Sequence, residues 1–170
     1  MTVSEYLNQG RVLDRRISMH TRQISYFEEM KTNIASAWRT GERVQTSPTL
    51  EAGYAQVVEQ IDTLTETLSR EMTLMILLKR QIRSVIHQVR DDAWRMALEA
   101  RYLSGASWGE VAVMLNKSEI CVRGWNRRAL ATLTLPEDAI NLTEALQSAP
   151  PDTPPGREGL PATFPLPAGR

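Results

Sequence analysis

The chain has 170 residues, and its 20 Lys and Arg are balanced by 20 Asp and Glu, so any basic or acidic binding surface must be local. One cysteine excludes an internal disulfide, and with only two histidines beside it no zinc or other transition-metal site of recognised spacing can be assembled. No nucleophile and base pair, phosphate-binding glycine loop or cofactor motif is present. We therefore expect no metal, no cofactor, no small-molecule substrate and no enzymatic activity.

The N-terminal residues, MTVSEYLNQGR, lack an apolar signal core. No stretch approaches the roughly 20 apolar residues that span a bilayer. We expect a cytoplasmic protein that makes no contact with a membrane.

Residues 1–90 carry apolar side chains at alternating spacings of three and four, which is typical of a coiled-coil seam. One seam runs from Val3 to Trp38 and a second from Tyr54 to Val89. The intervening residues 39–53 contain a proline and two glycines, which break helices and let the chain reverse. The pattern predicts an all-α fold that begins with a long antiparallel two-helix coiled-coil hairpin.

One register of this hairpin is favoured because it brings the two interior polar residues, His20 and Glu71, together. The same register sets Gly10 against the larger Ile82. The alternative is that His20 and Glu71 lean out into solvent and merely interrupt the seam. The favoured register predicts two further neighbouring pairs, Ile17 with Met75 and Ile24 with Leu68.

The run from Met72 to Leu78, MTLMILL, is apolar around nearly the whole helix, which is more surface than one partner helix covers. A second contact is therefore expected. Either residues 91–135 fold back onto this run or another copy of the chain covers it, and we expect a homo-oligomer.

Residues 91–135 are predicted to form three short helices, DDAWRMALEARYLSG, SWGEVAVML and SEICVRGWNRRALATL. Ser107 and Glu110 have the spacing of a capping box, and Gly105 and Asn116 suit left-handed turn positions. Ser118 is placed to cap the third helix. This succession of caps and turns predicts a helix-turn-helix.

The third helix and the turn before it carry four basic side chains against Glu119 alone, a local charge of plus three in a neutral chain. These basic residues are Lys117, Arg123, Arg127 and Arg128. Donors on the exposed face of such a helix are what DNA binding requires. The alternative is a helical hairpin whose arginines are simply solvated.

The segment RYLSGASWGEVAVMLNKSEICVRGWNRRALATL resembles region 4 of bacterial sigma factors, and residues 1–135 resemble small phage and prophage proteins that carry this domain behind an N-terminal hairpin. Such proteins are regarded as late-gene transcription regulators. The resemblance implies a sequence-specific regulator in the cytoplasm of a bacterial host cell, with double-stranded DNA as its partner and RNA polymerase as a further candidate. The implied DNA contacts, together with the basic residues above, are Lys117, Ser118, Glu119, Arg123, Gly124, Arg127 and Arg128.

Two alternative functions stay open. A small terminase subunit for DNA packaging also joins a helix-turn-helix to a coiled coil. A protein-interaction module would contact RNA polymerase or a sigma factor without binding DNA.

The C-terminal part divides into two segments. Residues 136–147 are predicted to form a short helix with Pro136 in its first turn. Residues 148–170 contain seven of the nine prolines and are expected to be disordered.

Overall fold

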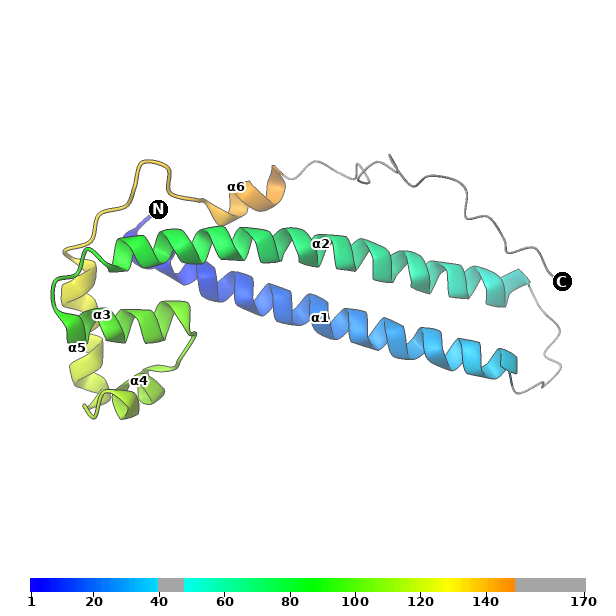
Figure 1. Ribbon diagram of the computed structural model, residues 1–170, viewed down its shortest axis with the longest axis horizontal. Helices are drawn as coiled ribbons and strands as arrows, with labels where there is room; N and C mark the ends of the chain where they lie inside the picture. Colours follow the sequence, from blue (N-terminus) through cyan, green and yellow to red (C-terminus); the bar gives the residue numbers. More distant parts are fainter. Residues whose placement is uncertain (40–47, 149–170) are drawn as a thin grey trace, which may run out of the picture.

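A computed structural model describes residues 1–39 and 48–148, and within these ranges the chain forms helices and turns without a strand. Two long helices, α1 (Val3–Arg39) and α2 (Pro48–Ile86), run side by side; most of the shorter helices gather at one end of the pair, and the last one lies alongside α2 (Figure 1). The shorter elements are α3 (Asp92–Leu98), the π-helical turn η1 (Glu99–Leu103), α4 (Trp108–Met114), α5 (Glu119–Leu130) and α6 (Leu142–Gln147). None of the helices in the described ranges combines the length and apolarity needed to cross a bilayer.

The long helices pair in antiparallel fashion. The hydroxyl of Tyr6 donates to Oε1 of Gln81 over 2.7 Å, and Arg16 Nη2 donates to Oε1 of Glu71 over 2.7 Å. The partner number on α2 therefore falls as the position on α1 rises. The predicted all-α fold with a long antiparallel helix pair is confirmed.

The polar layer lies inside this pair, as its register predicts. Glu71 is buried, and Nε2 of His20 lies 3.5 Å from Oε1 of Glu71. Arg16 joins the layer through Nε as well as Nη2, a contact that the seam pattern does not predict. The predicted pairing of Gly10 with Ile82 is also confirmed, because a Cβ built on Gly10 would lie 3.3 Å from Cδ1 of Ile82.

Helix α2 begins earlier than predicted. Helix α2 begins at Pro48 and continues through Gly53, whereas both residues were expected to interrupt the helix. Proline suits the first turn because its missing N–H would have no helical partner there, and one glycine costs a long helix only about 1 kcal/mol. Residues 40–47 and the proline-rich residues 149–170 lie outside the described residues.

Helix α3 and the turn η1 contribute side chains to two hydrophobic cores. The predicted single helix over 91–105 contains a π turn, in which the N–H of Ser104 donates to the carbonyl of Glu99 over 3.1 Å. Leu98 and Tyr102 join the core of the long helix pair. The opposite side of the same segment packs on the core of the three-helix unit, which we define as residues 92–130; its buried members are Ala97, Ala100, Val111, Ala112 and Val122.

The last helix begins later than predicted. Helix α6 starts at Leu142, capped by Oδ1 of Asn141, and not near Pro136. Gln81 Oε1 accepts from the N–H of Ile140 over 2.9 Å, and Gln9 Nε2 donates to the carbonyl of Ile140 over 3.1 Å. Residues 136–139 form a hydrogen-bonded turn instead of a first helical turn, and glutamines of the long helices satisfy the backbone groups that follow it.

Part of the apolar run on α2 is covered by α6, which was not among the expected covers. Leu74 packs with Leu146 on the side where α6 lies. Met72, Ile76 and Leu77 stay exposed in the single chain, and the three-helix unit does not fold back over them. A second copy of the chain thus remains the expected cover for these side chains.

Candidate nucleic-acid interface

The helix caps and turns of the three-helix unit are formed by the residues that the local sequence pattern indicated. Gly105 has φ 79° and Asn116 has φ 50°, so both occupy the left-handed conformation that reverses the chain. Ser107 and Glu110 form a complete capping box at the start of α4. The hydroxyl of Ser118 accepts the N–H of Cys121 over 3.2 Å and caps α5. Each of these predicted roles is confirmed.

Helix α5 separates a buried face from a basic face. Val122 and Ala129 are buried against the two cores. Arg123, Arg127 and Arg128 are exposed. At about 100° per residue, Arg123 and Arg127 share one edge of the exposed face and Arg128 lies on the other.

The start of this basic face is organised around Trp108 of α4. The guanidinium of Arg101 lies 4.7 Å from the centroid of the indole, and that of Arg123 lies 5.7 Å from it. Arg123 Nε also donates to Oε1 of Glu119 over 2.8 Å. Arg123 is therefore held near the first turn of α5 by an ion pair and a cation–π contact.

A basic residue of the long helix pair approaches the same place. Burial lowers the pKa of the Arg101 guanidinium, and the positive charge of Arg11 on α1 lowers it further, followed by that of Arg123. Close packing explains the approach, since a Cβ built on Gly10 would lie 3.6 Å from the carbonyl oxygen of Tyr102. Arginines from α1, η1 and α5 thus form one positive cluster.

Local sequence patterns do not predict this cluster in full. Arg101 stands within the motif that resembles sigma factors, but Arg11 lies on another helix about 90 residues earlier. Only the docking of η1 on α1 brings it near.

The predicted site residues lie together at one end of the molecule. Some of them are already engaged in contacts within the chain, whereas others are exposed. Ser118 is committed to capping and Glu119 to its pair with Arg123, whereas Gly124 is half-buried and has nothing within 4 Å of a built Cβ. The remaining predicted members, all exposed, are Lys117, Arg123, Arg127 and Arg128.

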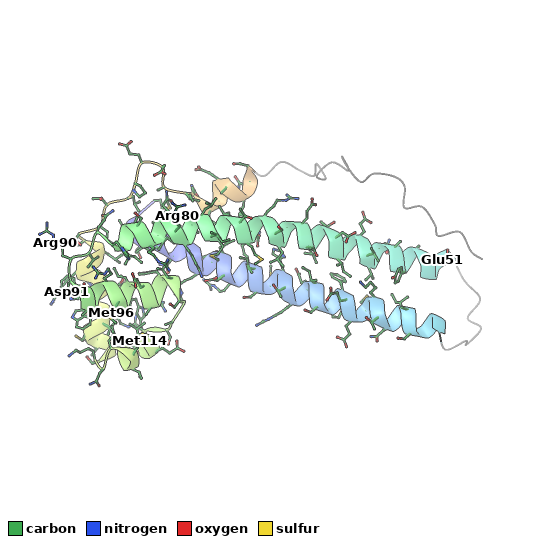
Figure 2. The ribbon with its side chains drawn as sticks, viewed as in Figure 1. Glu51, Arg80, Arg90, Asp91, Met96 and Met114 are labelled. Carbon is green, nitrogen blue, oxygen red and sulfur yellow. The ribbon has the colours of Figure 1, made fainter. Side chains whose placement is uncertain are left out.

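Apolar side chains are also exposed at this corner. Val113 on α4 is 84% exposed and Ile120 on α5 is 85% exposed. Met114, which Figure 2 places at the outer end of α4, is exposed as well. The corner therefore offers both positive charge and apolar surface to a partner.

Within residues 1–39 and 48–148, no three His, Cys, Asp or Glu side chains lie close enough together to hold a metal ion. Comparisons with protein-family models, with curated proteins and with solved structures give no match.

Proposed function

We propose that this chain is a sequence-specific DNA-binding transcription regulator, encoded by a phage or prophage, whose residues 91–135 act as a helix-turn-helix resembling sigma-factor region 4. The single observation that carries the proposal is the exposed basic face of α5, which follows a tight left-handed turn and a capped helix start. A helix presented in this way can enter the major groove with its first turns toward the bases.

The two kinds of contact fall on different residues. Lys117, Arg127 and Arg128 are assigned to phosphates, because they flank or follow the helix start. Arg123 is assigned to a base edge, since it lies one turn into the helix. Its ion pair with Glu119 is exposed, so exchanging this partner for a guanine costs little.

The test uses the full chain and a duplex selected from a random pool, compared with a scrambled duplex across a salt series. Arg128→Ala should weaken both duplexes alike and reduce the slope of log affinity against log salt by about one. Arg123→Ala should weaken the selected duplex by about 1–3 kcal/mol and the scrambled duplex much less. Arg22→Ala on the exposed side of α1, far from α5, is the matched control and should change neither.

Equal losses on both duplexes for Arg123→Ala and Arg128→Ala would show that α5 holds DNA without reading it. No change from either variant would refute the assignment of α5 as the DNA contact.

A second candidate function is favoured by the exposed Val113 and Ile120 beside the basic cluster. A protein-interaction module would use this apolar corner to contact RNA polymerase or a sigma factor without DNA. Val113→Ser with Ile120→Ser should then abolish polymerase pull-down, while the selection from random DNA enriches nothing.

The DNA sites that the protein binds in the cell distinguish a transcription regulator from a small terminase subunit for DNA packaging. Recovery of bound DNA from the producing cell should enrich promoters for the regulator. Enrichment of a packaging site instead would favour the terminase subunit.

A further inference from the structure

Helix α2 carries a second heptad stripe on one flank of its buried seam, about 100° around the helix from it. Each member lies one residue after a position of the buried seam, so the spacing of three and four is preserved. We call this set the outer stripe; it consists of Ala55, Val58, Asp62, Thr65, Ser69, Met72 and Ile76. Met72 is 52% exposed and Ile76 is 68% exposed, so the large residues of the stripe have no cover among the residues that the structure describes. A shallow groove lined by residues between Tyr54 and Ser69 follows its first half.

The volumes along the outer stripe are graded. Its first end carries the smaller apolar residues Ala55 and Val58 and its second end the larger Met72 and Ile76, with polar residues between them. An antiparallel copy centred on Thr65 would place Ala55 opposite Ile76 and Val58 opposite Met72. The two outer layers at each end then combine one smaller with one larger apolar side chain, which is what close packing needs, while the central layers pair Asp62 with Ser69 and Thr65 with Thr65. A parallel copy would set large against large and small against small.

The charges beside the outer stripe are graded in the same direction. Glu51 precedes the stripe and Glu59 lies in its first half, whereas Arg70 lies in its second half and Arg80 and Arg83 lie after it. The antiparallel register places Glu59 beside Arg70 of the second copy, which also pairs with Glu66 of its own chain, and Glu51 opposite Arg80. Opposite charges at flanking heptad positions select partner and orientation.

We propose that the outer stripe is the interface of an antiparallel homodimer, in which α2 packs on α2 of a second copy about a two-fold axis at Thr65. The interface uses the same surface on both copies and is therefore closed. It buries apolar side chains that α6 and the three-helix unit leave exposed. The proposal is independent of DNA binding and is tested without DNA.

The first experiment measures the mass of the full chain by sedimentation and light scattering. We expect a dimer for the parent protein and a monomer for Met72→Glu with Ile76→Glu. The matched control is Met19→Glu, which changes the same residue type at nearly the same exposure, 49%, on α1. This control should stay dimeric. All three should give the same circular dichroism, because the substituted side chains are exposed.

The second experiment determines the orientation in a Cys121→Ser background. Oxidation of the double variant Ala55→Cys with Ile76→Cys should give a covalent dimer. Ala55→Cys alone should stay uncross-linked, because in the antiparallel register each Ala55 faces Ile76 of the other copy.

Four results would overturn the proposal. They are a monomeric parent protein, a dimer that survives Met72→Glu with Ile76→Glu, cross-linking of Ala55→Cys alone, and open-ended polymers that Met19→Glu disperses. The last result would show that the exposed apolar side chains of α1 join one copy to the next in a head-to-tail chain.

Discussion

Tyr6 joins three segments of the chain through one hydroxyl. The hydroxyl donates to Oε1 of Gln81, which also accepts the N–H of Ile140. The ring is fully buried. Burial raises the pKa of the Tyr6 phenol to about 12, and the negative charge of Asp138 adds to the effect.

This pKa predicts a loss of stability at alkaline pH. The neutral phenol is favoured in the folded state, so its contribution is fully present below the ordinary pKa of about 10. It is lost as the pH rises from about 10 to about 12, up to about 2.7 kcal/mol for a difference of about two pKa units. Chemical denaturation at pH 8 and above pH 11 should show this loss in the parent protein and a smaller one in Tyr6→Phe.

Tyr26 provides the control because it is 60% exposed. Tyr26→Phe should retain the alkaline loss of the parent protein. The same pH dependence in Tyr6→Phe as in the parent would contradict the assignment.

The carboxylate of Glu71 is buried in the long helix pair, and only one of its two oxygens has hydrogen-bond partners. Its Oε1 accepts two hydrogen bonds from Arg16, whereas its Oε2 has no partner. Desolvating a carboxylate is costly, and replacing such a group by an apolar one of similar size is often neutral or stabilising.

The two partners of this pair should therefore respond differently to substitution. Arg16→Met should lower the free energy of unfolding by about 1–3 kcal/mol, because the buried carboxylate loses both of its hydrogen bonds and keeps only His20 nearby. Glu71→Met should change it little or raise it, since the half-exposed Arg16 can turn to solvent. The double variant should recover most of the loss. Urea denaturation of the four proteins checks this, and equal losses from the two single variants would contradict it.

At the scale of the elements, the predictions that succeeded depend on neighbours in sequence. Caps at Ser107 and Ser118 and turns at Gly105 and Asn116 are decided within a few residues, so the sequence alone indicates them. The predicted start of α6 was wrong because the backbone before this helix is bound by side chains far away in the sequence, those of Gln9 and Gln81.

Contacts between residues far apart in the sequence were predictable only where the heptad periodicity of the two long helices indicated them. Periodicity placed His20 beside Glu71, yet it said nothing of Arg16, which reaches the layer from a position flanking the seam. Arg11 likewise meets the three-helix unit through the packing of η1 on α1, for which the sequence holds no local signal.

A substitution of Gly124, in the middle of α5, tests whether this helix approaches DNA closely. Glycine destabilises a helix interior by roughly 1 kcal/mol relative to alanine, and a Cβ at this position would meet nothing within 4 Å. Gly124→Ala should therefore raise the free energy of unfolding by about that amount. If the helix approaches a duplex there, the same variant should weaken DNA binding.

The comparison needs both measurements, thermal unfolding and affinity for the selected duplex. Gly105→Ala is the control, because its φ of 79° should make alanine destabilising. Stabilisation without any loss of affinity would show that α5 does not bring its backbone at Gly124 close to DNA.

At the scale of the whole molecule, the long helix pair and the three-helix unit are joined by a common core. Leu98 of α3 and Ala129 of α5 are fully buried in the same cluster as Leu78 of α2. The orientation of α5 is therefore fixed relative to α2. A dimer formed through α2 would hold two copies of α5 at a defined separation.

That separation can be expressed as a spacing on DNA. Thr65 lies about 20 residues before the end of α2, which corresponds to roughly 30 Å at about 1.5 Å per residue. The two-fold axis doubles this to about 60–70 Å between the three-helix units, close to two helical turns of B-DNA. An antiparallel two-fold dimer should accordingly recognise inverted half-sites whose centres lie about 20 base pairs apart.

Binding to duplexes with altered spacers checks this last prediction. Inserting about five base pairs turns one half-site to the opposite side of the duplex, so affinity should fall at least about tenfold. Met72→Glu with Ile76→Glu should bind each duplex more weakly and with no dependence on the spacer, because each monomer then engages one half-site alone. A parent protein that tolerates the insertion would contradict the rigid two-fold arrangement, whereas a parent that binds no duplex would contradict DNA recognition itself.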